Sequence, residues 1–203
     1  MKVKLTKGEL KRQRDALKQY ERYLPTLQLK KQQIQLEILR QAVILEEKER
    51  AEMSKKEAAK VWAGLLSDKS IDINPLVKPA KVITDSRNIA GVDIPVFINV
   101  EFAPAEYDLF EAPLWVDNAL DALRAIVSVR EEITVIKKGL TILRQELRIT
   151  TQRVNLFEKV KIPEASEAIR LIKIYIGDQM ANAVGRSKIA KRKIKRHESA
   201  VAI

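Results

Sequence analysis

The sequence contains no cysteine and only one histidine, His197, among its 203 residues. Without cysteine the chain forms neither disulfides nor a thiolate metal site, and a reducing compartment suits it. A single histidine also leaves out the usual zinc constellations and any Ser-His or Cys-His pair for nucleophilic catalysis. These absences argue against classical hydrolase chemistry, and we expect neither a metal nor a cofactor.

Glycine and proline are also scarce, with six and seven residues, whereas hydrophobic residues make up 46% and charged residues 32% of the chain. This composition favours long helices over a sheet protein with many turns. The glycines match neither G-x-x-x-x-G-K-[ST] nor G-x-G-x-x-G, so no phosphate-binding loop is expected. Carboxylate pairs such as Glu46 with Glu47 are typical of solvated helix faces. We therefore predict that the chain is not an enzyme.

No apolar run approaches the roughly 20 residues that a membrane-spanning helix needs. The opening MKVKLTKGELKRQRD lacks the apolar segment of a signal peptide. We expect a soluble, intracellular protein without direct membrane insertion.

The formal net charge of +11 is concentrated at the two ends of the sequence. Residues 1–31 hold ten lysines and arginines against three carboxylates, and residues 186–197 hold seven without any carboxylate. From the residues alone, an acidic protein cavity and a nucleic acid are equally good partners for these ends, with a merely solvated surface close behind. A membrane surface fits less well, because Ala183, Ser187 and Ala190 are poor apolar anchors.

Two long stretches carry the seven-residue apolar repeat of a coiled coil. In the first, Lys31 breaks the pattern and Pro25 predicts a bend in the helix. In the second, the repeat continues to Phe157, and after Pro163 the apolar stripe resumes in a shifted phase from Ile169. The seam positions are Val3, Thr6, Leu10, Gln13, Leu17, Tyr20, Leu24, Leu27, Ile34, Ile38, Gln41 and Leu45 in the first stretch, and Ile126, Val129, Ile133, Ile136, Leu140, Leu143, Leu147, Thr150, Val154 and Phe157 in the second.

The segment between the two stretches has a different composition. Residues 74–113 contain five of the seven prolines, and β-branched runs at residues 82–84 and 96–100 flank the sequence SRNIAGVD. This pattern predicts a small hairpin with Gly91 near its turn, and Pro95 suits an edge strand.

Two long helices joined by one compact connector must run antiparallel, because the chain turns back once. We predict a mainly α fold, a long antiparallel two-helix coiled coil formed by an N-terminal helix (residues 1–67) and a C-terminal helix (residues 113–203), with a small β-hairpin connector (residues 68–112). Both termini then lie at one end. The second helix is the longer one, and we expect its excess length at the connector end, covered by the hairpin with Leu114, Trp115 and Leu120.

The stretch TQRVNLFEKVKIPEASEAIRLIKIYIGDQ resembles the second long helix of the D subunit of V-type (A/V-type) ATP synthases and ATPases, which carries an R-V-N-x-[LF]-E-x-V-x-I-P block. The opening LTKGELKRQRDALKQ and the segment NIAGVDIP, residues 88–95, are similar to the same family in the same order. The block consists here of Arg153, Val154, Asn155, Phe157, Glu158, Val160, Ile162 and Pro163.

The resemblance implies a central rotor shaft that couples ATP synthesis or hydrolysis to rotation of a membrane ring and to proton or sodium transport. It implies a non-catalytic, cytoplasmic subunit peripheral to the cell membrane, with the A and B subunits of the catalytic ring, the F subunit and the C (or d) subunit as partners. A basic coiled-coil protein that binds nucleic acid or ribosomes is the alternative, but the resemblance implies no nucleic-acid partner. Under the resemblance, the residues expected to contact the A and B ring are Lys11, Arg12, Arg14, Lys18, Lys188, Lys191, Arg192, Lys193, Lys195 and Arg196.

Overall fold

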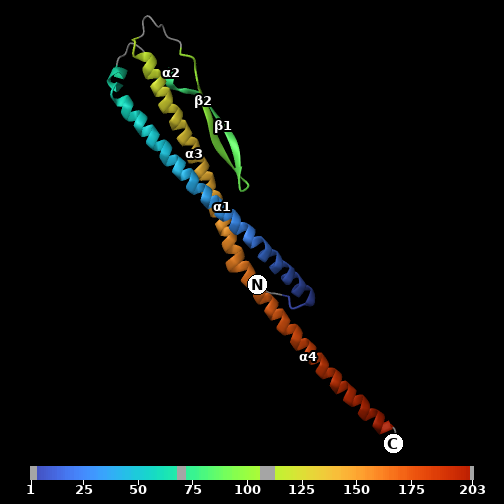
Figure 1. Ribbon diagram of the computed structural model, residues 1–203. Helices are drawn as coiled ribbons and strands as arrows, with labels where there is room; N and C mark the ends of the chain where they lie inside the picture. The colour runs from blue at the N-terminus through green and yellow to red at the C-terminus, as the bar shows by residue number, and fades with distance from the viewer. Residues whose placement is uncertain (1–3, 68–71, 106–112, 202–203) are drawn as a thin grey trace. The chain divides into compact units, whose positions relative to one another are not determined.

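The computed structural model describes residues 4–67, 72–105 and 113–201, with side chains for residues 4–66, 72–105 and 113–195. Its elements follow in the order α1 (Lys7–Lys60), a 3-10 turn η1 (Ala63–Ser67), α2 (Asn74–Val77), β1 (Pro79–Ile89), β2 (Val92–Phe102), α3 (Val116–Leu156), a π turn η2 (Phe157–Lys161) and α4 (Ile162–Val201). The colours of Figure 1 show that β1 and β2 follow α1 and precede α3 along the chain. The predicted fold class, two long helices with a hairpin connector, is confirmed.

The start of α1 is capped by its own sequence. The backbone N–H of Glu9 donates to the Thr6 hydroxyl oxygen at 3.2 Å, and the Glu9 carboxylate accepts a bond from the Gln13 amide at 2.7 Å. Thr-x-x-Glu is the sequence of a capping box, in which a hydroxyl satisfies one of the free N–H groups of the first turn. From this start α1 continues through Pro25 to Lys60 without a break.

The chain divides into two compact units. The hairpin unit comprises residues 30–150, and the terminal unit comprises residues 1–29 and 151–203. Both units contain part of α1 and part of the second long helical region.

In the hairpin unit, α1 and α3 pair antiparallel. Lys30 Nζ bonds the Glu146 carboxylate at 2.8 Å, whereas Lys48, further along α1, bonds Glu132, earlier in α3, at 2.8 Å. Several seam positions predicted from the heptad repeat are buried, namely Ile34 in α1 and Ile133, Leu140, Leu143 and Thr150 in α3. Others, such as Ile38, Ile136 and Leu147, are only partly buried, and Val135 is buried outside the seam.

The hairpin packs against this helix pair. Val92 and Ile94 of β2 form one buried cluster with Ile34 of α1 and Leu143 of α3. Figure 1 shows the strands lying along α3. The hairpin was expected to cover excess helix at the connector end together with Leu114, Trp115 and Leu120. This expectation is wrong for the hairpin, which packs against Ile34 and Leu143, and for Leu114, which is 95% exposed, although Leu120 is buried.

The hairpin turn has the chemistry of a tight two-residue loop. Ala90 and Gly91 adopt positive φ angles of 52° and 75°, which the right-handed twist of the strands requires in such loops. Asn88 holds the turn, since its side-chain oxygen accepts from the Gly91 N–H at 3.1 Å and its amide donates to Asp93 at 2.6 Å. The predicted place of Gly91 near the turn is confirmed.

Arg124 of α3 ties both ends of the hairpin to the helix. Its guanidinium donates to the carbonyl oxygens of Leu76 at 3.1 Å and of Ala103 at 2.8 Å, and it lies 5.2 Å from the centroid of the Phe102 ring. These contacts fix the connector where it leaves α2 and where it follows β2.

In the terminal unit, the first half of α1 lies beside η2 and the start of α4. The Tyr20 and Phe157 rings are 5.4 Å apart between centroids, and Val154, Ala165, Ile169 and Ile172 are buried. Every residue from Gly177 to Lys195 is exposed. The excess length of the second helix therefore lies at its C-terminal end, because α1 begins at Lys7 and no other described segment covers this part of α4.

Candidate partner-binding surfaces

The basic C-terminal segment, defined as residues 186–195, lies on the uncovered part of α4. Its predicted contact residues Lys188, Lys191, Arg192, Lys193 and Lys195 are all exposed. The side chain of Arg196 lies outside the described residues. With Arg186, the segment is an exposed helix with six cations and no described covering element, which is a surface suited to an acidic partner.

The same part of α4 also carries exposed aliphatic side chains. Ile189 and Ile194 in the segment and Val184 just before it are exposed, and Ala183 and Ser187 border a shallow depression of about 320 Å³ with Lys188 and Lys191. Lysines and arginines thus alternate with aliphatic residues along this helix, rather than forming a purely ionic surface.

The four predicted contact residues at the N-terminal end lie on α1. Lys11, Arg12, Arg14 and Lys18 are all exposed, and Arg12 borders a cavity whose α4 wall ends at Leu171. Lys188 lies 17 residues further along α4, about 25 Å at 1.5 Å per residue. The structure therefore places the two basic groups at separate positions along the terminal unit rather than in one cluster.

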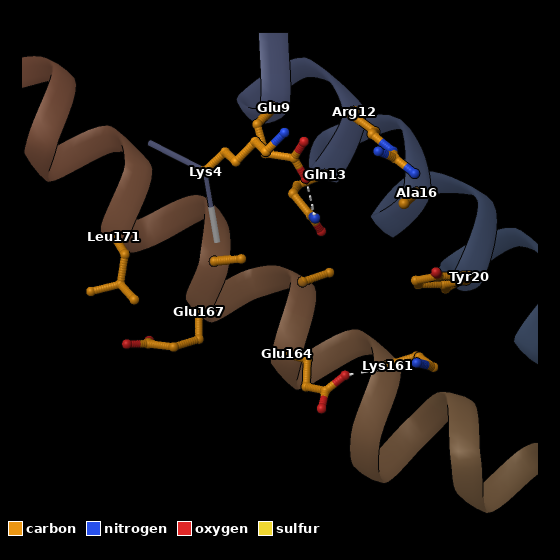
Figure 2. A pocket seen from close by; sticks show the side chains of 12 residues that line it. Lys4, Glu9, Arg12, Gln13, Ala16, Tyr20, Lys161, Glu164, Glu167 and Leu171 are labelled. Atoms are coloured by element: carbon orange, nitrogen blue, oxygen red, sulfur yellow. Dashed lines mark hydrogen bonds and ion pairs between the residues drawn. The ribbon is translucent and has the colours of Figure 1, made fainter. Parts of the chain in front are cut away.

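The cavity itself lies between α1 and α4 and has a volume of about 610 Å³. Figure 2 shows Glu9, Arg12 and Gln13 on the α1 side and Lys161, Glu164, Glu167 and Leu171 on the α4 side. Charges of both signs line it, and Lys161 and Glu164 approach to 3.9 Å. Sequence reasoning did not find this cavity.

The carboxylates of this wall are engaged in local helix pairs. Hydrogen bonds from Arg170 hold the pKa of Glu167 below its ordinary value, and the same contacts raise the pKa of Arg170. A carboxylate stabilised in its charged form is a poor proton donor near neutral pH. Over the described part of the chain, no group of three or more Asp, Glu, His or Cys side chains is placed to bind a metal ion.

A second surface lies on α1 in the hairpin unit, and we call it the leucine groove. Leu36, Leu39 and Val43 are 57%, 64% and 57% exposed, although they are large and aliphatic. The groove has a volume of about 600 Å³ and is lined by Gln32, Gln35, Leu36, Ile38, Leu39 and Leu147. None of these lining residues is charged.

Sequence reasoning missed the leucine groove, although a signal was present. Leu36, Leu39 and Val43 are spaced three and four residues apart, which is a second apolar stripe beside the seam of Ile34 and Ile38. On α3, Arg144 and Arg148 lie within one turn of Leu147 and are exposed. The groove is therefore an uncharged surface, and Arg144 and Arg148 are near Leu147 in the sequence but are not part of its lining.

The block that carries the family resemblance coincides with the π turn. Val154 is buried and Phe157 and Ile162 are partly buried, whereas Arg153, Asn155, Glu158 and Pro163 are exposed or only partly covered. The backbone N–H of Ile162 donates to the Phe157 carbonyl oxygen, five residues back. The sequence predicted a shifted apolar phase after Pro163, and the π turn is the structural cause of that shift.

No helix in the described residues is long and apolar enough to cross a membrane.

Comparisons with known proteins agree with the resemblance. The family model for the D subunit of ATP synthase matches residues 9–192. The D subunit of a V-type ATP synthase from Borreliella burgdorferi is 44% identical over 190 residues, which are 94% of each chain. The proteins of the same name from Chlamydia pneumoniae and Chlamydia caviae are 34% and 36% identical, over 96% and 97% of this chain and 94% and 95% of their own length. The chain therefore belongs to the family of ATP synthase D subunits.

Proposed function

We propose that this chain is the central shaft of a V-type rotary ATP synthase or ATPase, a non-catalytic subunit on the cytoplasmic side of the membrane. In this role it couples ATP synthesis or hydrolysis in the ring of A and B subunits to rotation of the membrane ring and to proton or sodium transport. The observation that carries the proposal is the basic part of α4 from Gly177 to Lys195, which no other described segment covers. Family membership supports the same assignment.

The basic C-terminal segment is proposed to enter the A and B ring, together with the cations at the start of α1. Charges on an exposed helix remain hydrated, so their attraction to an acidic wall is screened over about 8–10 Å. Such a contact holds the shaft without a deep apolar socket and lets it pass between orientations. The proposed contact residues are Lys11, Arg12, Arg14, Lys18, Lys188, Lys191, Arg192, Lys193, Lys195 and Arg196.

An asymmetric helix pair inside a three-fold ring cannot meet three equivalent interfaces identically. Each orientation of the shaft then favours a different conformation at each interface, in proportion to the difference in contact free energy. Rotation exchanges these preferences, while the bond-making chemistry stays with the ring subunits. Composition alone left both a protein and a nucleic acid open as partners of the basic residues. Membership of the family of ATP synthase D subunits favours the protein ring.

The leucine groove is proposed as the contact surface for the F subunit. An uncharged face with Leu36 and Leu39 more than half exposed is suited to an amphipathic helix of a partner, which would cover it through apolar packing. Arg144 and Arg148 would face carboxylates of that partner. The C (or d) subunit is the proposed link to the membrane ring.

Neutralising the basic C-terminal segment tests the shaft role. Replacing Lys191, Arg192, Lys193, Lys195 and Arg196 by glutamine should weaken ATP-driven ion transport per ATP hydrolysed, because the attraction to the ring is lost. The far-ultraviolet circular dichroism and melting of the isolated chain should remain unchanged. A matched control neutralises five exposed cations elsewhere, Lys55, Lys81, Arg87, Arg130 and Lys138. Full coupling in the first variant would contradict the proposed role of the segment.

A separate experiment tests the leucine groove. Changing Leu36 and Leu39 to glutamate should remove the F subunit from the purified complex while the A and B subunits remain, because two carboxylates cannot be buried unpaired. The control is Gln33→Glu, which adds a carboxylate at an exposed position of the same helix outside the groove. Retention of the F subunit at full stoichiometry in the double variant would show that it binds elsewhere.

A further inference from the structure

The π turn η2 adds one residue to the turn that joins α3 and α4. The Ile162 N–H bonds a carbonyl five residues back, whereas an α-helix uses the carbonyl four residues back. If the heptad repeat continued from Val154 without this insertion, Lys161 and Glu164 would occupy the next seam positions. The observed seam instead contains Ala165, Ile169 and Ile172, each one position later than the repeat predicts. Burial of these apolar side chains is thus what holds the extra residue in the helix.

Pro163 weakens the hydrogen bonding at the same place. Proline has no N–H, so a carbonyl of the preceding turn, that of Glu158 or Lys159 depending on the local spacing, lacks its helical donor. In an α-helix the proline ring would also collide with the carbonyl of Lys159. A wider turn before the proline reduces that conflict but restores no bond.

Packing around the turn is sparse as well. None of the residues in Phe157–Lys161 is buried, although buried residues stand on either side at Val154 and Ala165. The cavity of about 610 Å³ begins here, with Lys161 and the small residues Ala16 and Ala168 in its lining. Figure 2 shows the open space between the two helices at Lys161 and Glu164. Hydrogen bonding and side-chain packing are therefore reduced at one and the same position.

We propose that the π turn is a hinge, the position at which the second helix of the terminal unit opens and bends most readily. Regions with few buried apolar contacts and incomplete backbone bonding have the lowest local opening free energy. Opening at residues 157–163 would let the exposed part of α4 bend relative to the first turns of α1. This inference concerns the chain alone and holds whether or not the basic segment enters a ring.

Hydrogen exchange of the intact chain, followed by mass spectrometry, tests the hinge. Amides of residues 158–162 should exchange at least about tenfold faster than those of residues 145–150 and 169–173 in the same helical region. Equal protection along all three segments would overturn the proposal.

Deleting Val160 provides a sharper test. Val160 is exposed, and its removal takes out the extra residue, so the turn should become α-helical while Ala165, Ile169 and Ile172 stay in the seam. Exchange at the former turn should slow about tenfold and the melting temperature should not fall. The matched control is deletion of Gln145, an exposed residue of α3, which puts Leu147, Thr150 and Val154 out of phase and should lower the melting temperature. Loss of protection in the Val160 deletion would contradict the hinge.

If the Val160 deletion variant does not fold, a substitution at Pro163 still tests the hinge. Pro163→Ala restores one N–H donor without changing the chain length. Exchange at residues 158–160 should then slow several-fold in a chain with an unchanged seam. No change in exchange would show that the proline and the turn do not set the opening.

Discussion

Truncation of Leu140 to alanine tests the helix pair of the hairpin unit at its seam. Leu140 is 2% exposed, so the variant removes buried methylene groups and leaves a cavity. Buried Leu→Ala changes cost about 2–5 kcal/mol in the free energy of unfolding. With a cost of about 3 kcal/mol and a shift of about 2–4 °C per kcal/mol for a chain of this size, the melting temperature should fall by about 6–12 °C.

Two further leucines on the same pair of helices provide matched variants. Leu147 is partly buried, so its truncation should cost less than that of Leu140, about 1–2 kcal/mol. Leu39 is exposed in the leucine groove, and its truncation should change stability by no more than about 0.5 kcal/mol in the isolated chain. The three variants share one chemical change and differ only in burial.

Tryptophan fluorescence is the appropriate assay for this series. Both tryptophans, Trp62 and Trp115, belong to the hairpin unit, so their signal reports on that unit even if the two units unfold at different temperatures. Equal melting temperatures for the Leu140 and Leu39 variants would refute the seam derived from the heptad repeat.

Three other predictions follow from local geometry. Gly139→Ala should stabilise the chain by about 0.5–1 kcal/mol, because an added Cβ would meet Ile94 and Pro95 at an ordinary 3.8 Å and alanine favours the helix; a lower melting temperature would show that the hairpin packs more closely than this. Ala90→Gly should raise the free energy of unfolding of the hairpin unit by about 1 kcal/mol, because a positive φ disfavours a residue with Cβ, and the urea midpoint should rise accordingly; an unchanged or lower midpoint would contradict this. The lowered pKa of Glu167 adds stability above the unfolded-state pKa, near 4.5, and that contribution is lost as pH falls through the folded-state pKa. Carboxyl chemical shifts should report a Glu167 midpoint below 4.5 that rises in Arg170→Ala; an unchanged midpoint would contradict the pairing.

The heptad repeat predicted the pairing of the helices because burial at every third or fourth position is a local property of the sequence. Ile34, Leu140 and Leu143 are buried where the repeat placed them, and the shifted phase beyond Pro163 was also visible in the sequence. The hairpin turn was predictable for the same reason, since Gly91 supplies the required backbone angle.

Alignment of the two helices along their length could not be predicted in the same way. The repeat fixes which faces meet, but moving one helix by seven residues keeps every seam position in contact. The observed register, with Lys30 opposite Glu146, depends on the connector and on the contact of Ile94 with Leu143. This is why the uncovered length of the second helix lies at its C-terminal end rather than at the connector.

The two exposed aliphatic surfaces differ in a way that bears on the proposed rotation. In the leucine groove Leu36 and Leu39 have no charged neighbour in the lining, so a partner could pack there closely and would be costly to displace. In the basic C-terminal segment, aliphatic side chains such as Ile189 alternate with cations such as Lys188, whose hydration opposes close apolar packing. A tightly packed partner must turn with the shaft, whereas a hydrated contact can be exchanged as the shaft turns. The distribution of charge along the chain therefore favours the groove for a co-rotating subunit and the basic segment for a stationary ring.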